Sequence, residues 1–364
     1  MNKKHIKIYI IGLKYSLKFY MQIHKEILNQ FLLTEERPID LIIPNYDRRS
    51  LFSLPSDFIN IFKWLKKTKP IYIISVGPKV GFLFALASVI SDFKLIHWFT
   101  GQYWALKKIK IFSLSFIADF CTNLLAYKTI CDSKEQAYFL RNNFFIKRVL
   151  FDNYGSINYV SKDLYLIGEK RLKKINSLDF RYEYPIKVGF LGRICLEKGL
   201  EIIKELSKDI YLKSKFKFFI RGPIDSSISK YDPEFKNNKY FLDANSNIDF
   251  NEGFIKNSEF FNAVDIFLLP SKREGFGSVA LEAQACAIPV ICSDIYGLYS
   301  SVIEGYGGIH CKNLEEYKNA LKVLEDRSSY KKFCNNAFQF SLNYAGDKFK
   351  NNLFQIYKKI ILIN

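Results

Sequence analysis

The residues best suited to chemistry lie in one short segment, which contains Glu274, Gly275, Phe276, Gly277, Ser278 and Glu282. The apolar run Ile266–Leu269 before it predicts a buried strand, and the residues after Gly277 predict a helix. Glycines let the backbone pass close to a ligand, and a helix amino terminus favours a phosphate. Glu282 could accept hydrogen bonds from ribose hydroxyls, and Glu274 from those of a second sugar. The alternative is an ordinary strand–helix loop whose acidic residue complements the helix dipole.

A second loop in the same half of the chain carries two cations. The run Ile186–Leu191 predicts a strand, Gly192-Arg193 follows it, and Lys198-Gly199 opens a predicted helix. A guanidinium and an ammonium on one loop suit a diphosphate. Surface Arg and Lys residues are common on loops, so this loop alone does not indicate a site. Together with the glutamate loop it predicts a site for a nucleoside-diphosphate sugar.

Strand-like and helix-like segments alternate along the chain and predict parallel sheets covered by helices. In the first half the predicted strands are Ile6–Ile11, Ile39–Pro44, Ile71–Val76, Leu95–Phe99, Thr129–Asp132 and Val149–Asn153. In the second half they are Ile186–Leu191, Lys217–Ile220, Ile248–Phe250, Ile266–Leu269 and Pro289–Cys292. We expect an α/β fold with two doubly wound, Rossmann-like domains facing each other across a cleft. Such sheets bind ligands beyond the carboxyl ends of their strands, where both loops would lie.

The length of 364 residues is enough for two domains of ordinary size. The polar and charged stretch Gly168–Tyr184 indicates a linker between them. We therefore predict a first domain over 1–180, a second over 181–346 and a last helix over 347–364, which could cross back to the first domain.

The motifs of the second half resemble those of the retaining GT-B glycosyltransferases of family 4. The resemblance is carried by Gly192-Arg193 with Lys198-Gly199, and by the Glu-x7-Glu pair Glu274 and Glu282. Further matches are Arg221-Gly222, Gly253-Phe254-Ile255, Asp265 before an apolar strand, and Ala287–Ile291. The resemblance covers about residues 186–310. It implies a GT-B fold, with an acceptor-side first domain and a donor-binding second domain.

The resemblance also implies a role for individual residues. Arg193 and Lys198 would neutralise the leaving diphosphate, so that with Glu274, which would contact the donor sugar, they are the candidate catalytic residues. Glu282 would hold the ribose. The other implied donor-binding positions are Gly12, Gly192, Gly222, the backbone near Phe254 and Ile255, Gly275, Phe276, Gly277 and Ser278.

No metal and no resident cofactor are expected. Two cations would already stabilise the departing negative charge, and the chain contains no Asp-x-Asp sequence. The nucleotide sugar is a co-substrate, with a UDP-sugar as the favoured donor, and a hexosyl or N-acetylhexosaminyl group would be transferred. Base selection rests on main-chain contacts, so the sequence leaves the nucleobase, the sugar, the acceptor and the linkage open.

The first half of the chain matches bacterial surface-polysaccharide members of the family, of the O-antigen or capsule type, less closely. Its candidates on the acceptor and sugar side are Thr100 and Gly101. Many relatives have a histidine where Thr100 stands, so the identity of that sugar contact is open. His97 is interpreted as a core histidine at a strand end.

Positive charge is concentrated in this half, because residues 1–180 hold 28 Lys and Arg against 14 Asp and Glu, which gives +14 of the total +18. In the resembled family the acceptor is often a polyprenyl-diphosphate-linked glycan at the inner membrane. Segments 62–67 and 105–112 interleave cations with large apolar residues, which suits a membrane surface or packing on their own sheet. No binding motif accompanies the charge, so nucleic acid is not expected.

The seven cysteines are scattered and lack Cys-x-x-Cys spacing, which indicates a reducing compartment. The longest apolar stretch, Val80–Ile90, has 11 residues and is too short to span a bilayer. The first residues do not resemble a signal peptide. We expect a cytoplasmic protein that could lie on the inner membrane as a peripheral protein.

Two other functions stay open. A nucleotide-sugar 2-epimerase has a similar architecture and acts without an acceptor, but no His-Arg constellation supports it in the second half, where His310 is the only histidine. A non-catalytic donor-binding subunit is the other, and the departure at Thr100 keeps it open. Hydrolysis of a donor by the purified protein would exclude it.

Overall fold

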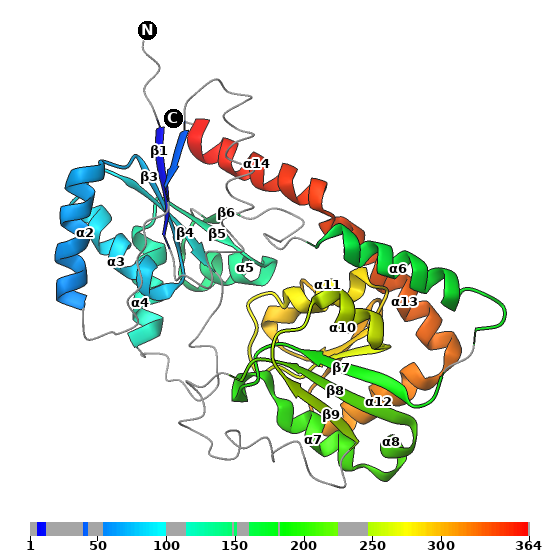
Figure 1. Ribbon diagram of the computed structural model, residues 1–364. Coiled ribbons are helices and arrows are strands. Elements are labelled where there is room, and N and C mark those ends of the chain that lie inside the picture. Colours follow the sequence, from blue (N-terminus) through cyan, green and yellow to red (C-terminus); the bar gives the residue numbers. More distant parts are fainter. Residues whose placement is uncertain are drawn as a thin grey trace. The chain divides into compact units, whose positions relative to one another are not determined.

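The structure is a computed structural model that describes residues 6–11, 39–42, 54–99, 114–147, 149–150, 160–180, 183–224 and 247–362. The chain divides into two compact units, which Figure 1 shows. Unit 1 comprises Met1–Ile157 with Asp347–Asn364, and unit 2 comprises Asn158–Gly346. Within the described ranges, none of the helices is both long and apolar enough to cross a membrane.

Unit 1 is built on six parallel strands in the order β2-β1-β3-β4-β5-β6. Strands covered on both faces read as apolar runs, and β3 is buried along its whole length. The strands are β1 (Ile6–Ile11), β2 (Ile39–Ile42), β3 (Tyr72–Val76), β4 (Lys94–Phe99), β5 (Lys128–Cys131) and β6 (Val149–Leu150). The helices are α2 (Leu54–Thr68), α3 (Pro78–Val89), α4 (Leu114–Leu125), α5 (Lys134–Asn143) and α14 (Gly346–Leu362).

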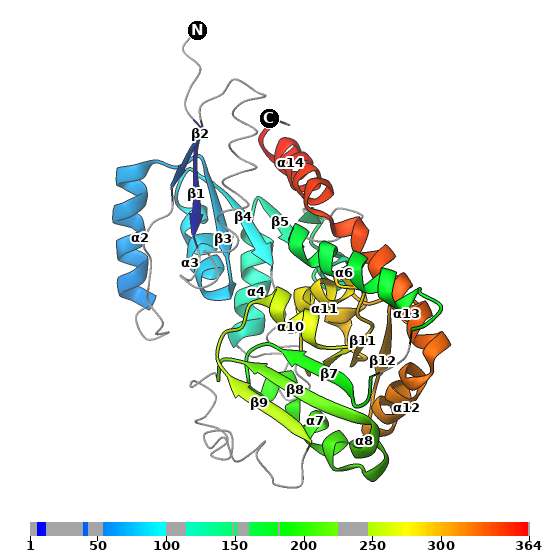
Figure 2. The same cartoon turned by 45° about the vertical axis from the view of Figure 1, so that its right-hand side comes forward.

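Helix α3 contacts both α2 and α4, and these three helices lie together in Figure 2. Leu83 and Phe84 of α3 pack with Ile61 of α2 in one buried cluster that reaches Tyr9 of β1. A second cluster joins α5 to the ends of β4 and β5 through Leu140 and its apolar neighbours. Apolar side chains therefore fasten helices to this sheet in two separate places.

Unit 2 has a second parallel sheet of six strands, in the order β12-β11-β10-β7-β8-β9. The strands are β7 (Ile186–Leu191), β8 (Phe216–Gly222), β9 (Ile248–Glu252), β10 (Ile266–Leu269), β11 (Val290–Ser293) and β12 (Gly308–Cys311). One helix layer contains α6 (Lys162–Ile175), α10 (Asn257–Ala263), α11 (Ser278–Ala285) and α13 (Arg327–Ser341), and the other contains α7 (Leu200–Lys208), α8 (Ile210–Lys215) and α12 (Leu314–Glu325). The predicted α/β fold with two doubly wound sheets is confirmed.

The boundary between the units differs from the predicted one, since it lies after Ile157 and not after residue 180. The stretch predicted as a linker, Gly168–Tyr184, begins inside helix α6. Its lysines and Glu169 lie on the exposed face of that helix, whereas Leu164, Gly168 and Ile175 are buried. Helix α6 contacts α10, α11 and α13, which ties it to unit 2. The last helix, α14, belongs to unit 1.

The contact between α6 and α11 depends on the missing side chain of Gly168. A β-carbon at this position would lie 2.2 Å from the carbonyl oxygen of Ala285 and 2.7 Å from the ring of Phe338. Real atoms do not approach so closely, and one of the two obstacles is backbone. The two helices can therefore pack at this distance only while residue 168 is glycine.

We predict that Gly168→Ala lowers the free energy of unfolding by about 1–3 kcal/mol, because the added methyl group overpacks the helix contact. In an exposed helix position the same change would stabilise by up to about 1 kcal/mol. Urea unfolding monitored by circular dichroism measures the difference. Glu169→Ala, at the exposed neighbouring position, is the control and should change stability little. Equal stability of the Gly168 variant and the natural protein would contradict the close contact.

Candidate active site

The predicted donor loops all follow the carboxyl ends of parallel strands in unit 2. The loop with Arg193 follows β7, Gly222 closes β8, Gly253 follows β9, and the loop with Glu274 follows β10. Because these strands are parallel neighbours, their carboxyl ends lie in one row along the sheet, which we call its carboxyl edge. That edge is where open α/β sheets bind ligands, so the fold brings the second-half candidates to one side of the unit.

The loop after β10 is anchored by a buried ring and turned by a glycine. Phe276 is 3% exposed, and its ring lies 5.8 Å from that of Tyr344. Gly277 caps helix α11 with a φ of 73°, and a β-carbon there would lie 2.4 Å from Leu298. Phe276 therefore supports the loop from inside the core. Any ligand contact that it makes at this loop would come from its backbone.

The structure brings Lys198 and Glu274 into direct contact. The Lys198 Nζ donates to Glu274 Oε1 at 2.5 Å, and Ser271 Oγ donates to the same oxygen at 2.7 Å. The two charged side chains are only 15% and 12% exposed. Removing one partner of such a pair would leave a poorly hydrated charge, which costs several kcal/mol. The pair therefore holds the cation and the carboxylate in one defined place.

A second set of contacts fastens the same two loops. Arg273 Nη2 donates to Glu197 Oε2 at 2.8 Å, and the Lys272 amide donates to the Glu197 carbonyl oxygen at 2.8 Å. Gly199 follows with a φ of 64°, and a β-carbon there would lie 1.9 Å from the carbonyl oxygen of Pro270. The loop after β7 and the loop after β10 therefore form one unit with Lys198 and Glu274 between them.

Arg193 lies in the loop after β7 with its side chain exposed. The backbone here is crowded, since a β-carbon on Gly222 would lie 1.8 Å from the carbonyl oxygen of Gly192. Burial raises the pKa of the Cys195 thiol, and the positive charges of Arg193 and Lys198 act against this rise. Both predicted cations thus act on the same sulfur.

Glu282 lies one helix turn from the start of α11 and pairs with a residue of α10. Its Oε2 accepts a hydrogen bond of 2.6 Å from Asn257 Nδ2. Burial raises the pKa of Glu282 to about 7, and the nearby charge of Asp163 adds to the rise, whereas the Asn257 amide lowers the pKa. This carboxylate is partly buried and already has one amide donor, so it is held in place for a further hydrogen-bond partner.

The segment after β9 presents a large exposed ring. Phe254 is 94% exposed, while the neighbouring Ile255 packs against the core. The Gly253 amide donates to the carbonyl oxygen of Gly222 at 3.2 Å, which ties this segment to the end of β8. The position is the one at which the resemblance implies the nucleobase.

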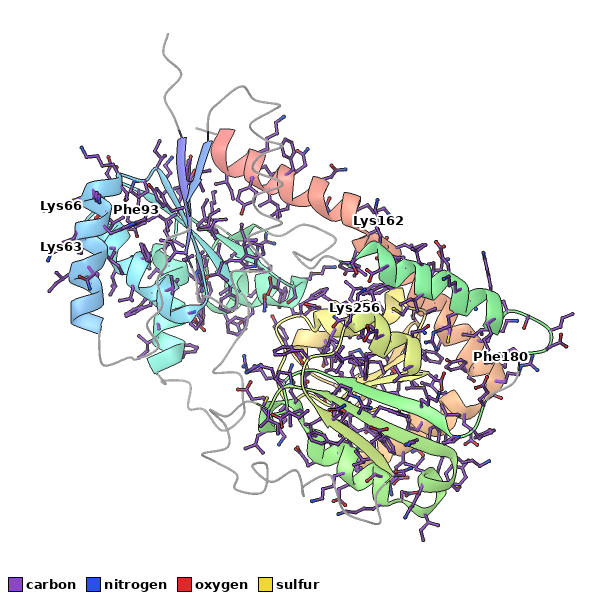
Figure 3. The ribbon with its side chains drawn as sticks, viewed as in Figure 1. Lys63, Lys66, Phe93, Lys162, Phe180 and Lys256 are labelled. Atoms are coloured by element: carbon purple, nitrogen blue, oxygen red, sulfur yellow. The ribbon has the colours of Figure 1, made fainter. Side chains whose placement is uncertain are left out.

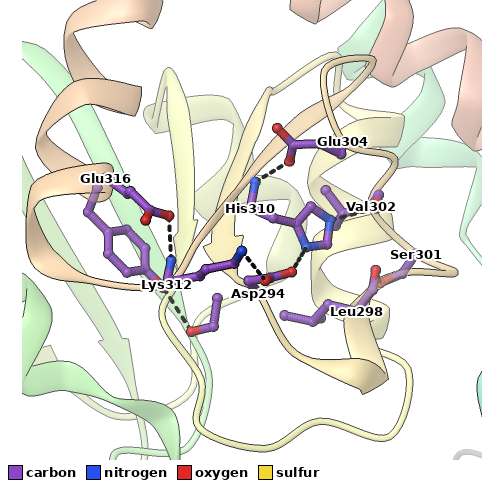
Figure 4. Close-up of polar contacts among 10 residues, drawn as sticks. Asp294, Leu298, Ser301, Val302, Glu304, His310, Lys312 and Glu316 are labelled. Carbon is purple, nitrogen blue, oxygen red and sulfur yellow. Dashed lines mark hydrogen bonds and ion pairs between the residues drawn. The ribbon is translucent and has the colours of Figure 1, made fainter.

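The same sheet edge continues at β11 and β12, which Figure 4 shows in detail. His310 Nε2 lies 2.8 Å from the Val302 carbonyl oxygen, and Asp294 lies 3.9 Å from His310 Nδ1 and 3.7 Å from Lys312 Nζ. These contacts hold the turn that contains Gly297. A β-carbon on Gly297 would lie 1.9 Å from the Glu274 carbonyl oxygen, so this turn supports the backbone of Glu274.

Three residues that matter to this geometry were not predicted as site residues: Ser271, Asn257 and Gly297. Ser271 stands within the motif that contains Glu274, and its position three residues earlier was the available signal. Asn257 contacts a residue 25 positions away, and Gly297 approaches backbone 23 positions away. Such pairings depend on how two loops meet in space, which spacing along the chain does not reveal.

Most of the site residues predicted in the first half of the chain cannot be compared with the structure. Gly12, Thr100 and Gly101 lie outside the described residues, so their roles stay predictions. His97 is described and is buried in β4, where its Nδ1 lies 3.0 Å from Ser75 Oγ. Burial lowers the pKa of His97 to about 3, which keeps the ring neutral. The interpretation of His97 as a core histidine is confirmed.

We predict that Glu282→Gln gains stability relative to the natural protein as pH rises. The folded-state pKa of Glu282 is about 7 against an ordinary value of 4.5, so stability falls as pH rises between these values, and the full penalty applies above pH 7. The variant lacks this penalty. Its advantage at pH 8 over pH 5 should be about 1–2 kcal/mol, reduced from the full shift because the side chain is partly exposed.

Urea unfolding of both proteins at the two pH values tests this. Glu259→Gln, an exposed change in the neighbouring helix α10, is the matched control and should follow the natural protein at both pH values. Parallel pH profiles for the Glu282 variant and the natural protein would show that the carboxyl titrates normally.

The sequence of this chain is similar to those of known glycosyltransferases. Residues 175–340 match the family model described as Glycosyl transferases group 1. The capsular polysaccharide biosynthesis glycosyltransferase CapM of Staphylococcus aureus is 25% identical over 73% of this chain and 70% of its own length. The N,N'-diacetylbacillosaminyl-diphospho-undecaprenol alpha-1,3-N-acetylgalactosaminyltransferase of Campylobacter jejuni is 24% identical over 89% of this chain and 86% of its own length.

Solved structures share the fold of the whole chain. Anabaena HepE in complex with UDP and glucose has a TM-score of 0.67 at 16% identity, over 98% of this chain and 100% of that protein. Sucrose-phosphate synthase of Thermosynechococcus elongatus has a TM-score of 0.68 at 16% identity, over 99% of this chain and 100% of that protein. At this identity the likeness establishes the fold alone. With the family match and the capsular relatives, it supports a glycosyltransferase with the GT-B fold.

Proposed function

We propose that this chain transfers a sugar from a nucleoside diphosphate to an acceptor hydroxyl, with retention of the anomeric configuration. The observation that carries the proposal is the Lys198–Glu274 pair with its Ser271 donor, held between two loops at the carboxyl edge of the unit 2 sheet. Arg193 and Glu282 lie on the same edge. Cations for a diphosphate and carboxylates for hydroxyl groups are therefore present in one place.

Lys198 and Arg193 would stabilise the diphosphate as it departs. Breaking a glycosyl–phosphate bond builds negative charge on the leaving oxygen, and preorganised cations lower the barrier. In the structure, Lys198 is paired with Glu274. A bound diphosphate offers Lys198 other oxygens, which releases the Glu274 carboxylate to accept hydrogen bonds from the transferred sugar.

The nucleoside would lie along the edge towards β9. The Glu282 carboxylate accepts hydrogen bonds from the ribose hydroxyls, and Asn257 donates to its Oε2 and so keeps the carboxylate in place. The base lies at the segment with Gly253 and Ile255, where backbone groups select it. The proposal of a UDP-sugar is supported by the likeness to Anabaena HepE, whose structures contain UDP, UDP with glucose, or UDP-glucose.

Retention and independence of metal complete the proposed reaction. The acceptor hydroxyl attacks from the face that the phosphate leaves, and a phosphate oxygen takes its proton, so no separate base is needed. Within the ranges that the structure describes, His, Cys, Asp and Glu side chains form no group of three or more that could hold a metal ion. Lys198 and Arg193 would stabilise the departing diphosphate, as a metal ion does in other enzymes. Independence of added metal stays a prediction.

The proposed acceptor is a lipid-linked glycan in surface polysaccharide synthesis. The Campylobacter relative is named for transfer to a sugar on diphospho-undecaprenol, and the Staphylococcus relative for capsular polysaccharide biosynthesis. The strong positive charge of residues 1–180 would favour a diphosphate-bearing acceptor and the anionic surface around it. We propose that the chain works at the cytoplasmic face of the membrane.

Thermal shift with UDP, GDP, ADP and TDP tests donor binding. A ligand that binds only the folded state raises the apparent melting temperature, so one of the four should stabilise the natural protein above the others. Lys198→Ala should abolish that shift. Product analysis with the matching nucleotide sugar then separates transfer from 2-epimerisation and from binding alone. Failure of all four nucleotides to stabilise the protein would overturn the proposal.

Glu274→Gln should separate binding from turnover. It removes the carboxylate that competes for Lys198, so the nucleoside diphosphate should bind several-fold more tightly. It also removes the acceptor for the sugar hydroxyls, so kcat should fall by about 10²–10³-fold. Calorimetry and a transfer assay measure the two effects, with the exposed Glu315→Gln as control. Unchanged kcat in the Glu274 variant would contradict its assigned role.

A further inference from the structure

A cavity of about 280 Å³ lies at the amino-terminal ends of the strands of the unit 2 sheet, whereas the donor loops follow their carboxyl ends. Lys187, the second residue of β7, and Asp265, directly before β10, both line it. The donor loops follow the other ends of these two strands. A six-residue strand separates its ends by about 15–20 Å, so the cavity is a different place from the nucleotide site.

The cavity is lined by more cations than carboxylates. The cations are Lys170, Arg171, Lys174 and Lys187, and the carboxylates are Glu183 and Asp265. Lys174 and Glu183 pair at 3.2 Å, but both side chains are mostly exposed, so this pair is weak. Among the residues that the structure describes, neither Lys170 nor Lys187 forms an ion pair.

The carboxylate at the base of the cavity is already engaged. Asp265 Oδ2 accepts the Lys187 amide at 3.0 Å, and its Oδ1 lies 3.6 Å from Arg171 Nη1. Arg171 also donates from Nη2 to the Phe261 carbonyl oxygen at 2.7 Å. Its Nε is buried and has no hydrogen-bond partner. Asp265 and Glu183 therefore offset only part of the charge of the four cations, so the lining keeps a net positive charge, and the guanidinium is not fully satisfied.

Two aromatic side chains form part of the remaining wall. Phe180 and Tyr330 stack with ring centroids 6.2 Å apart and an angle of 11° between their planes. Figure 3 marks Phe180 beyond the end of α6, beside α13. Ile167 and Ile175 complete this side of the cavity. A ligand that fits this cavity carries an anionic group that pairs with the lysines and a small carbon skeleton that packs against the aromatic rings.

We propose that this cavity binds a small phosphorylated metabolite, the size of a sugar phosphate. Lysine and arginine side chains are the usual donors to phosphate oxygens. The cavity volume lies just below the range of about 300–1,000 Å³ that is typical of sites for drug-sized ligands. A cavity of this size is too small for a polymer. The site belongs to unit 2 alone and does not depend on the proposed sugar transfer.

Isothermal titration calorimetry of the full chain tests this, with glucose 6-phosphate and inorganic phosphate as probes at about 0.15 M salt, where weak surface attraction is screened. The test variant is Lys170→Ala with Lys187→Ala. Both lysines are exposed at the rim, so the fold should persist. The matched control is Lys173→Ala with Lys208→Ala, which removes equal charge from exposed positions that do not line the cavity.

We expect the natural protein to bind glucose 6-phosphate and the test variant to bind it at least 10-fold more weakly, since two charged contacts are lost. The control variant should bind as the natural protein does. UDP affinity, measured on the same samples, should be equal in all three, which separates this site from the donor loops. Absence of binding, equal weakening in the control, or weakening only by Arg193→Ala with Lys198→Ala would each overturn the proposal.

Discussion

One salt bridge, between Lys198 and Glu274, is the constraint around which the edge of unit 2 is arranged. It joins loops that follow different strands, and each loop needs the other to keep its charge paired in a place with little water. The pair Arg273–Glu197 repeats the connection beside it. The carboxyl ends of parallel strands bring the loops within reach, and the paired charges then join them.

Several glycines around this pair let the backbone of one segment approach the backbone of another closely. The β-carbons that Gly199, Gly222 and Gly297 lack would each lie within 2 Å of a carbonyl oxygen in a neighbouring loop. The loops after β7, β8, β10 and β11 therefore meet through their main chains. These main-chain contacts and the two ion pairs hold the loops together.

The sequence predicted the sheets better than the helices and contacts. Ile266–Leu269 was predicted to the residue, because a buried parallel strand is an unbroken apolar run. The sequence indicates a linker over Gly168–Tyr184, which overlaps the second half of helix α6, because most of the exposed positions there are charged. Helices α10, α12 and α13 and strand β12 were not predicted. Lys198 and Glu274 were expected at one site, but their direct pairing depends on the meeting of two loops, which no local pattern encodes.

The two ends of unit 2 are joined to each other. Unit 2 begins at Asn158 and ends at Gly346, and near these limits Val160 and Ala345 form a parallel β-bridge. Residues at the beginning of the unit are therefore bonded to residues at its end. Unravelling of one end breaks a contact that also holds the other, so the two ends open together and not one by one.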